Sequence, residues 1–281
     1  MNKRNYSISI LVATLLLVVL IVLGENYVQN SVKRQKVLYH SRMTPTIFVP
    51  GSSATKERFN DMIDFFNSKQ IKHSVLKVEV SKNNQLTYYG NIQSKDNNPF
   101  IVIAFEDNRD GYETIKKQAE WLSIAMTDLQ VRYKFQHFNA IGHSNGGLNW
   151  TIFLENGYLA SNFHMDHLLT IATPFNFEES NSSNKTQMLK DLIDSREMLP
   201  SDLSVYNLAG TDSYDGDKIV PFSSVDCGKY IFQKMVKHYT QLTVTGDAAT
   251  HSDLPSNPEV MQFIEDKILR PNPSDKIHNK E

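Results

Sequence analysis

The feature of this sequence that most limits its fold is a repeated alternation of short apolar runs with amphipathic segments. Residues 100–105 (FIVIAF) form a continuous apolar run of strand length. Residues 112–133 then carry apolar side chains at helical spacing, namely Ile115, Ala119, Leu122, Met126 and Leu129. Strands that alternate with helices form mostly parallel sheets with helices on both faces, so the sequence predicts an α/β fold.

The same alternation continues along the chain. We expect further strands at residues 46–49, 75–80, 86–89, 138–141, 167–172, 203–208 and 239–244. We expect further helices at residues 56–68, 146–154, 223–237 and 258–269. Asn83 and Asn84 separate the second strand from the third, which predicts a hairpin there.

Charge and cysteine content exclude several classes of protein. The 281 residues include 29 Lys and Arg against 31 Asp and Glu, a net charge of −2. This balance offers no broad basic surface for phosphates, so we do not expect nucleic-acid binding. Cys227 is the one cysteine, which excludes an intrachain disulfide and a cysteine-based metal site. We expect Cys227 to be a buried, small apolar residue.

The N-terminal segment predicts a membrane location. Residues 8–23 are apolar except Ser9 and Thr14, and as a helix they would span about 24 Å, close to the thickness of a bilayer core. Lys3 and Arg4 precede this run, which favours a cytoplasmic N-terminus and an exported C-terminal part. We expect residues 1–24 to form a single-pass signal anchor. A cleaved signal peptide, which would release a secreted protein, is the alternative.

The remaining chain divides into three parts. We expect a linker at residues 25–43, one α/β domain at residues 44–270 and a polar tail at residues 271–281. Within the domain, residues 175–200 interrupt the alternation with an Asn- and Ser-rich stretch and a short amphipathic helix. An insertion of this kind often covers a site as a lid; a helix packed permanently on the rim is the alternative.

A candidate nucleophile lies between a predicted strand and a predicted helix. Gly142-His143-Ser144-Asn145-Gly146 has the pattern G-x-S-x-G. A serine hydroxyl becomes a useful nucleophile when a sharp turn presents it to a base, and the flanking glycines let other backbone pass close by. The pattern in this context predicts that Ser144 is catalytic.

A catalytic acid should follow a later strand. Asp217 is the best placed, because Ile219-Val220-Pro221 can anchor its loop; Asp215 is the alternative and Asp212 a distant third. The three acids could instead bind calcium, but their spacing is not that of an EF-hand loop.

The catalytic base should be a histidine beyond that acid. His251 follows the strand at residues 239–244 and precedes the last helix, which is where a base can face the nucleophile. His238 directly precedes a strand and His278 lies in the tail, so we expect both to be surface residues.

Two backbone N–H groups should stabilise a developing oxyanion. We expect one from Asn145, which follows the nucleophile, and the other from Ser52 or Ser53 in the loop after the first core strand. His164 and His167 have no evident third partner and should point to opposite faces of a strand, so we expect no metal site.

These motifs resemble the α/β-hydrolase superfamily, and more narrowly membrane-anchored cell-surface hydrolases of Gram-positive bacteria. The resemblance rests on IFVPG, FNAIGHSNGG, GDKIVP and HSDLPSN in that order, and it covers about residues 44–270. It implies a serine hydrolase that needs no cofactor, with Ser144, Asp217 and His251 as triad. Pro50 stands where histidine is usual, and Asn145 where methionine is frequent.

We therefore expect an extracytoplasmic, lipase-like or esterase-like enzyme that acts on a small-molecule or lipid ester through an acyl-enzyme. Transfer of the acyl group to an acceptor other than water is one alternative. A catalytically silent surface-binding domain on the same scaffold is another. The sequence leaves the acyl group, the leaving group and the oligomeric state open.

Overall fold

The computed structural model describes residues 14, 20, 22–25, 43–157, 163–212 and 215–270. The chain divides into two compact units, Met1–His40 and Ser41–Glu281. The described residues of the first unit are helical. The predicted anchor, linker and tail fall almost entirely outside the described residues. Within the described part of the chain, no helix combines the length and the apolar character that a membrane crossing requires.

The second unit is built on a mostly parallel sheet. In the described residues the sheet has eight strands in the order β3-β2-β4-β1-β5-β6-β7-β8. The strands are β1 (Thr46–Val49), β2 (Val75–Val80), β3 (Leu86–Gly90), β4 (Phe100–Phe105), β5 (His137–His143), β6 (His164–Ile171), β7 (Ser204–Thr211) and β8 (His238–Thr245). Only the hairpin of β2 and β3 is antiparallel among these pairs. The predicted α/β fold and the hairpin are confirmed.

The central strand fixes where the loops meet. β1 pairs in parallel with β4 and β5, so that Phe48 lies opposite Val102 on one side and Ile141 on the other. Parallel strands all end at the same edge of a sheet, and open α/β sheets place their sites at that edge. The loops that follow β1, β5, β7 and β8 therefore approach one another there.

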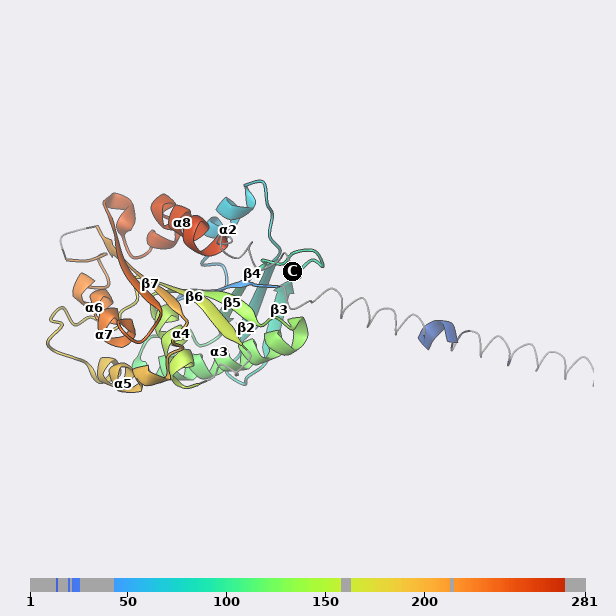
Figure 1. Cartoon of the computed structure of the whole chain (residues 1–281), viewed down its shortest axis with the longest axis horizontal. Coiled ribbons are helices and arrows are strands. Elements are labelled where there is room, and N and C mark those ends of the chain that lie inside the picture. Colours follow the sequence, from blue (N-terminus) through green and yellow to red (C-terminus); the bar gives the residue numbers. More distant parts are fainter. Residues whose placement is uncertain are drawn as a thin grey trace, which may run out of the picture. The chain divides into compact units, whose positions relative to one another are not determined.

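Helices cover both faces of the sheet, as the alternation predicts. α2 (Asn60–Asn67) and α8 (Pro258–Ile264) lie on one face, and α3 (Tyr112–Tyr133), α4 (Asn145–Glu155) and α5 (Gln187–Ser195) lie on the other (Figure 1). A large buried cluster fills the space beneath α2 and α8 and includes Phe48, Phe59, Met62, Phe66, Phe100, Leu169, Leu208, Val260 and Ile264.

Several predicted helix boundaries were wrong. The helix expected at residues 223–237 is two short helices, α6 (Phe222–Asp226) and α7 (Gly228–Phe232). Asn207 on β7 explains the end of α6, because its side-chain amide donates to the Val225 carbonyl at 2.8 Å. The helix expected at residues 56–68 begins only at Asn60, since hydrogen-bonded turns precede it. The helix expected at residues 258–269 has the predicted bounds, because a π-helical turn, Glu265–Leu269, follows α8 directly.

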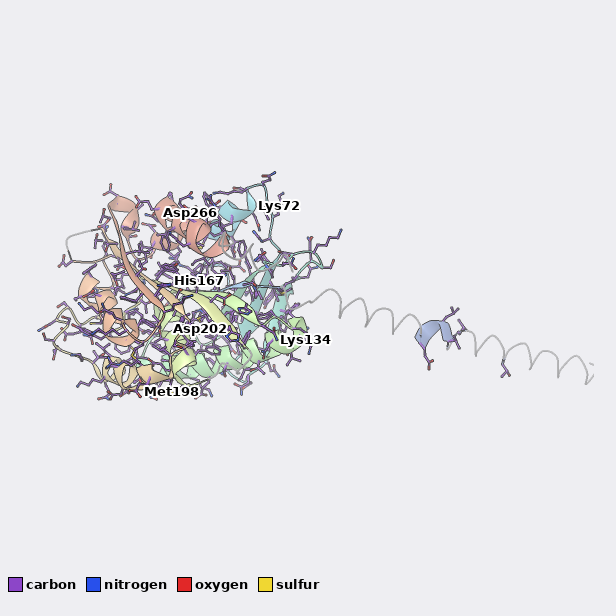
Figure 2. The ribbon with its side chains drawn as sticks, viewed as in Figure 1. Lys72, Lys134, His167, Met198, Asp202 and Asp266 are labelled. Carbon is purple, nitrogen blue, oxygen red and sulfur yellow. The ribbon has the colours of Figure 1, made fainter. Side chains whose placement is uncertain are left out.

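The insertion at residues 175–200 has a packed helix. α5 buries Met188, Leu189 and Leu192, and the Tyr112 hydroxyl on α3 donates to Asp191 on α5 at 2.9 Å. Met198, which follows α5, lies at the outer surface of this helical layer (Figure 2). α5 thus belongs to the helical layer, and a lid motion of the insertion stays a prediction.

Glu155, the last residue of α4, is an unusual buried acid. Its side chain is 6% exposed, and its Oε1 has no hydrogen-bond partner among the described residues. Burial raises the pKa of Glu155 from 4.5 to about 9. Between these two pH values the Glu155 carboxyl therefore stays protonated in the folded protein and is ionised in the unfolded chain. The contribution of this group to stability consequently declines as pH rises through that window.

We predict that Glu155→Gln removes this pH dependence. The neutral amide has no proton to lose, so the variant should gain stability relative to the parent chain at about pH 8.5, and the gain should shrink toward about pH 5. Urea denaturation at several pH values measures the free energies of unfolding. Glu120→Gln on the exposed face of α3 is the matched control. Identical pH dependence in the parent chain and Glu155→Gln would contradict the assignment.

Candidate active site

Ser144 occupies a sharp turn between a strand and a helix. β5 ends at His143 and α4 begins at Asn145. Ser144 itself has φ +55° and ψ −130°, a backbone conformation that costs a non-glycine residue about 1–3 kcal/mol. Its N–H donates to the Ile171 carbonyl at 2.8 Å, and its carbonyl accepts from the Gly147 N–H at 3.0 Å. These bonds hold the serine at the carboxyl edge of the sheet.

Close backbone contacts around Ser144 explain the glycines. A Cβ on Gly146 would lie 2.0 Å from the Val49 carbonyl oxygen, and a Cβ on Gly51 would lie 2.5 Å from the Cβ of Ser144. No side chain fits at either distance. The two glycines therefore let the loop after β1 pass directly beside the turn.

The histidine and the acid form a buried pair. His251 Nδ1 lies 2.8 Å from Asp217 Oδ2, and the two residues are 8% and 1% exposed. The other carboxylate oxygen accepts from the backbone N–H groups of Ile219 and Val220, at 3.0 and 2.7 Å. Asp215 is exposed and does not contact His251. With a proton on Nδ1 for Asp217, Nε2 of His251 is the basic nitrogen.

The three nearby acids do not converge on a common centre. Asp212 forms an ion pair with Lys218 at 3.0 Å, whereas Asp217 binds His251. The two histidines considered as a metal pair also diverge. His167 lies on the α8 face of the sheet with Nδ1 2.8 Å from Asn139 Oδ1 (Figure 2), and partly buried His164 is 3.7 Å from Asp202.

The backbone of His251 is held from three directions. The N–H of His251 donates to the Asp217 carbonyl at 2.8 Å, and the His251 carbonyl accepts from His143 Nε2 at 2.9 Å. The next carbonyl, of Ser252, accepts from Arg58 Nη2 at 2.5 Å. The loops after β7 and β1 and the last residue of β5 thus fix the position of this histidine.

Burial favours the neutral form of the His143 ring. Its ring is buried, 4% exposed, and its centroid lies 4.8 Å from that of His251. Burial, followed by the neighbouring charge of His251 when protonated and by Arg58, holds the pKa of His143 well below its usual range. A neutral ring that donates from Nε2 has its acceptor at Nδ1, and this atom has no hydrogen-bond partner among the described residues.

Ser144 and His251 line one cavity of about 650 Å³. Other residues of its wall are Ser52, Ser53, Arg58, Asp110, His143, Asn145, Phe177, Glu178, Ile219 and Val220. Within the described chain, no hydrogen bond engages the Ser144 hydroxyl, so it is available to His251 or to a substrate. Catalytic hydrogen bonds often tighten only when substrate binds.

The candidate oxyanion donors differ in whether their backbone N–H groups already have a hydrogen-bond acceptor. Asn145 is the first residue of α4, so its N–H has no acceptor within the helix, and its side-chain amide donates to Asp110 at 2.7 Å. The Ser53 N–H donates to the Asn108 carbonyl at 2.7 Å and is therefore occupied. Of the two serines expected in this role, we therefore propose Ser52 as the donor from this loop.

Arg58, Asp110 and His143 line the cavity and were not among the sequence candidates. His143 stands inside the G-x-S-x-G pattern, which was a usable signal. Arg58 and Asp110 carry no motif. The lone cysteine, Cys227, is buried outside this cavity, and burial raises the pKa of its thiol to about 11, so it is a poor nucleophile.

The eight-stranded sheet, with a strand-turn-helix serine at its carboxyl edge, defines an α/β-hydrolase fold. The chain belongs to the family described as "Alpha/beta hydrolase of unknown function (DUF915)", whose model matches residues 33–271. A search of curated proteins finds no match.

Solved structures agree with this assignment. A "putative cell surface hydrolase" from Lactobacillus plantarum is 48% identical, with a TM-score of 0.76 over 86% of this chain and 97% of that one. A gene product of Listeria innocua is 25% identical, with a TM-score of 0.74 over 82% and 96%. A lipase-esterase related protein from Clostridium acetobutylicum, 13% identical over 82% and 96% with a TM-score of 0.51, shares the fold.

The buried pair predicts which acid supports the nucleophile. Asp217→Asn should slow labelling of the serine by a fluorophosphonate about 10³- to 10⁴-fold, because the amide no longer holds the basic tautomer of His251. Asp215→Asn is the matched control and should label within about threefold of the parent chain, since surface changes have small effects. Labelling rates are read from fluorescent gels. A slow Asp215→Asn beside a normal Asp217→Asn would reverse the assignment.

Proposed function

We propose that this chain is an extracytoplasmic serine hydrolase that cleaves carboxylic esters through an acyl-enzyme on Ser144. The observation that carries the proposal is the buried bond between His251 Nδ1 and Asp217 Oδ2, next to the cavity that His251 shares with Ser144. Membership of an α/β-hydrolase family supports it.

Each residue of the triad has one role in the proposed reaction. His251 Nε2 takes the proton of the Ser144 hydroxyl as the oxygen attacks the ester carbonyl, and it then gives that proton to the leaving alcohol. Asp217 orients the ring and stabilises the imidazolium. Water, activated by the same histidine, attacks the acyl-enzyme and releases the acid and Ser144. Asp217 suits its role because one carboxylate oxygen accepts from two backbone N–H groups, which fixes the carboxylate while the other oxygen binds His251.

The negative charge on the former carbonyl oxygen needs two donors. In the proposed reaction these are the backbone N–H groups of Asn145 and Ser52. The side-chain amide of Asn145 donates to Asp110, so in the proposed reaction it is not a donor to the oxyanion. The same bond helps to fix the start of α4. The donors are therefore main-chain groups whose positions the fold sets.

The proposed location follows from the N-terminal sequence. The apolar run at residues 8–23 behind Lys3 and Arg4 would anchor the chain and place residues 44–270 outside the membrane. The description of the Lactobacillus plantarum relative as a cell surface hydrolase supports this proposal.

The direct test is hydrolysis of short p-nitrophenyl esters. Ser144→Ala should lower kcat by about 10³-fold or more, since the nucleophile is lost. Ser123→Ala is the matched control and should keep its activity, because the Ser123 hydroxyl lies on α3 and donates to the Glu120 carbonyl. Retained hydrolysis in Ser144→Ala would refute the proposal. Ester formation with an added alcohol in place of free acid would indicate acyl transfer to an acceptor other than water.

A further inference from the structure

Arg58 is the one permanently charged cation among the described residues that line the active-site cavity. It lies in the turns that precede α2, and its Nη2 donates to the carbonyl of Ser252, the residue after His251. The guanidinium is therefore tied to the loop that carries the proposed base.

Most of the binding capacity of Arg58 is unused. A guanidinium has five N–H donors, and the bond to Ser252 is the one hydrogen bond that the Arg58 guanidinium makes among the described residues. Arg58 also forms no ion pair within the described chain, although it is half-buried. Burial is the main influence on its pKa, which is lowered. A charge that is partly removed from water without a counter-ion is unfavourable until an anion or another strong acceptor binds it.

The acids nearest to Arg58 are engaged elsewhere. Glu57 binds Lys77 and Asn60, Asp61 accepts from the Ser256 hydroxyl at 3.3 Å, and Asp253 accepts from the Thr250 hydroxyl. Asp61 and Asp253 act on Arg58 only through the longer-range attraction of their charges.

Glu57 lines the cavity together with two further acids, Asp110 and Glu178. Asp110 accepts from the Asn145 amide and from the Gly111 N–H, both at 2.7 Å. Glu178, in the segment after β6, is exposed to solvent. Neither acid pairs with Arg58, so its free donors remain open to a bound molecule.

We propose that Arg58 binds an anionic group of the substrate, a carboxylate or a phosphate, while the ester bond lies at Ser144. A guanidinium recognises both anions through paired N–H donors, and such charge-assisted bonds are stronger than neutral ones. The substrate class is then an ester with a negative charge on its acyl or its alcohol part. This inference rests on the proposed ester hydrolysis at Ser144.

The experiment compares matched esters on the full chain. The acyl-side set is p-nitrophenyl butyrate, mono-p-nitrophenyl succinate and p-nitrophenyl 4-aminobutyrate, which differ in charge at one end. The alcohol-side pair is monobutyrin and its glycerol 3-phosphate counterpart. The measured quantity is the preference, the ratio of kcat/KM for the anionic ester to that for the neutral one.

We expect at least one anionic ester to be preferred. Arg58→Gln should lower that preference about tenfold or more, the effect of losing one charge-assisted hydrogen bond. Arg58→Lys should restore part of it, and added salt should weaken it. The matched control is Arg132→Gln, which changes an arginine on α3 that binds Asp128 and does not line the cavity, and it should leave the preference unchanged.

The ratio separates substrate binding from support of the loop. If Arg58 only fixes Ser252, its loss lowers kcat/KM equally for neutral and anionic esters and leaves the preference unchanged, which would overturn the inference. A preference for the cationic ester, set by Asp110 and Glu178, would also overturn it. Fluorophosphonate labelling at Ser144 in the same samples tests the proposed function separately, because labelling with no anionic preference refutes only the role of Arg58.

Discussion

The site depends on the fixed position of one residue, His251. Its side chain and its N–H both bind Asp217, and its carbonyl accepts from the ring of His143. A base that must move a proton between a serine and a leaving group has to hold its geometry within a fraction of an ångström. Bonds to the main chain provide that rigidity, because backbone groups at the ends of parallel strands have little freedom to shift.

The same edge of the sheet concentrates backbone strain. Ser53, Ser144 and Phe177 line the cavity with φ values of +58°, +55° and +51°, which non-glycine residues seldom adopt. Such conformations persist only where the surrounding structure determines them, and they gather at functional sites. Here the parallel sheet and the buried cluster beneath α2 and α8 supply the stability that keeps these loops in place.

Much of the fold could be predicted from local sequence. The predicted bounds of β1, β4 and α3 match Thr46–Val49, Phe100–Phe105 and Tyr112–Tyr133, because continuous apolar runs and helical spacing are strong local signals. The order of Ser144, Asp217 and His251 also follows from the motifs, and the structure brings the latter two into contact. Their catalytic roles stay predictions.

The remainder depends on contacts that leave no local pattern. Arg58 and His143 donate to the carbonyls of Ser252 and His251, which are distant in sequence, so no spacing rule predicts these two contacts, although the G-x-S-x-G pattern contains His143. The hydrogen bond from the Ser53 N–H to the Asn108 carbonyl depends on the conformation of the loop after β1. The break between α6 and α7 likewise depends on the side chain of Asn207 on β7. The helical spacing of residues 223–237 cannot reveal a contact from a distant strand.

The central claim is that Ser144 and His251 work as one unit, and a double-mutant cycle tests it most directly. The measurement is kcat for p-nitrophenyl butyrate in the parent chain, Ser144→Ala, His251→Ala and the double variant. When two residues act as one unit, removing the second causes no further loss of kcat after the first is removed. The double variant should therefore be no slower than the slower single variant. Losses that multiply in the double variant, or a His251→Ala variant with the activity of the parent chain, would contradict the account.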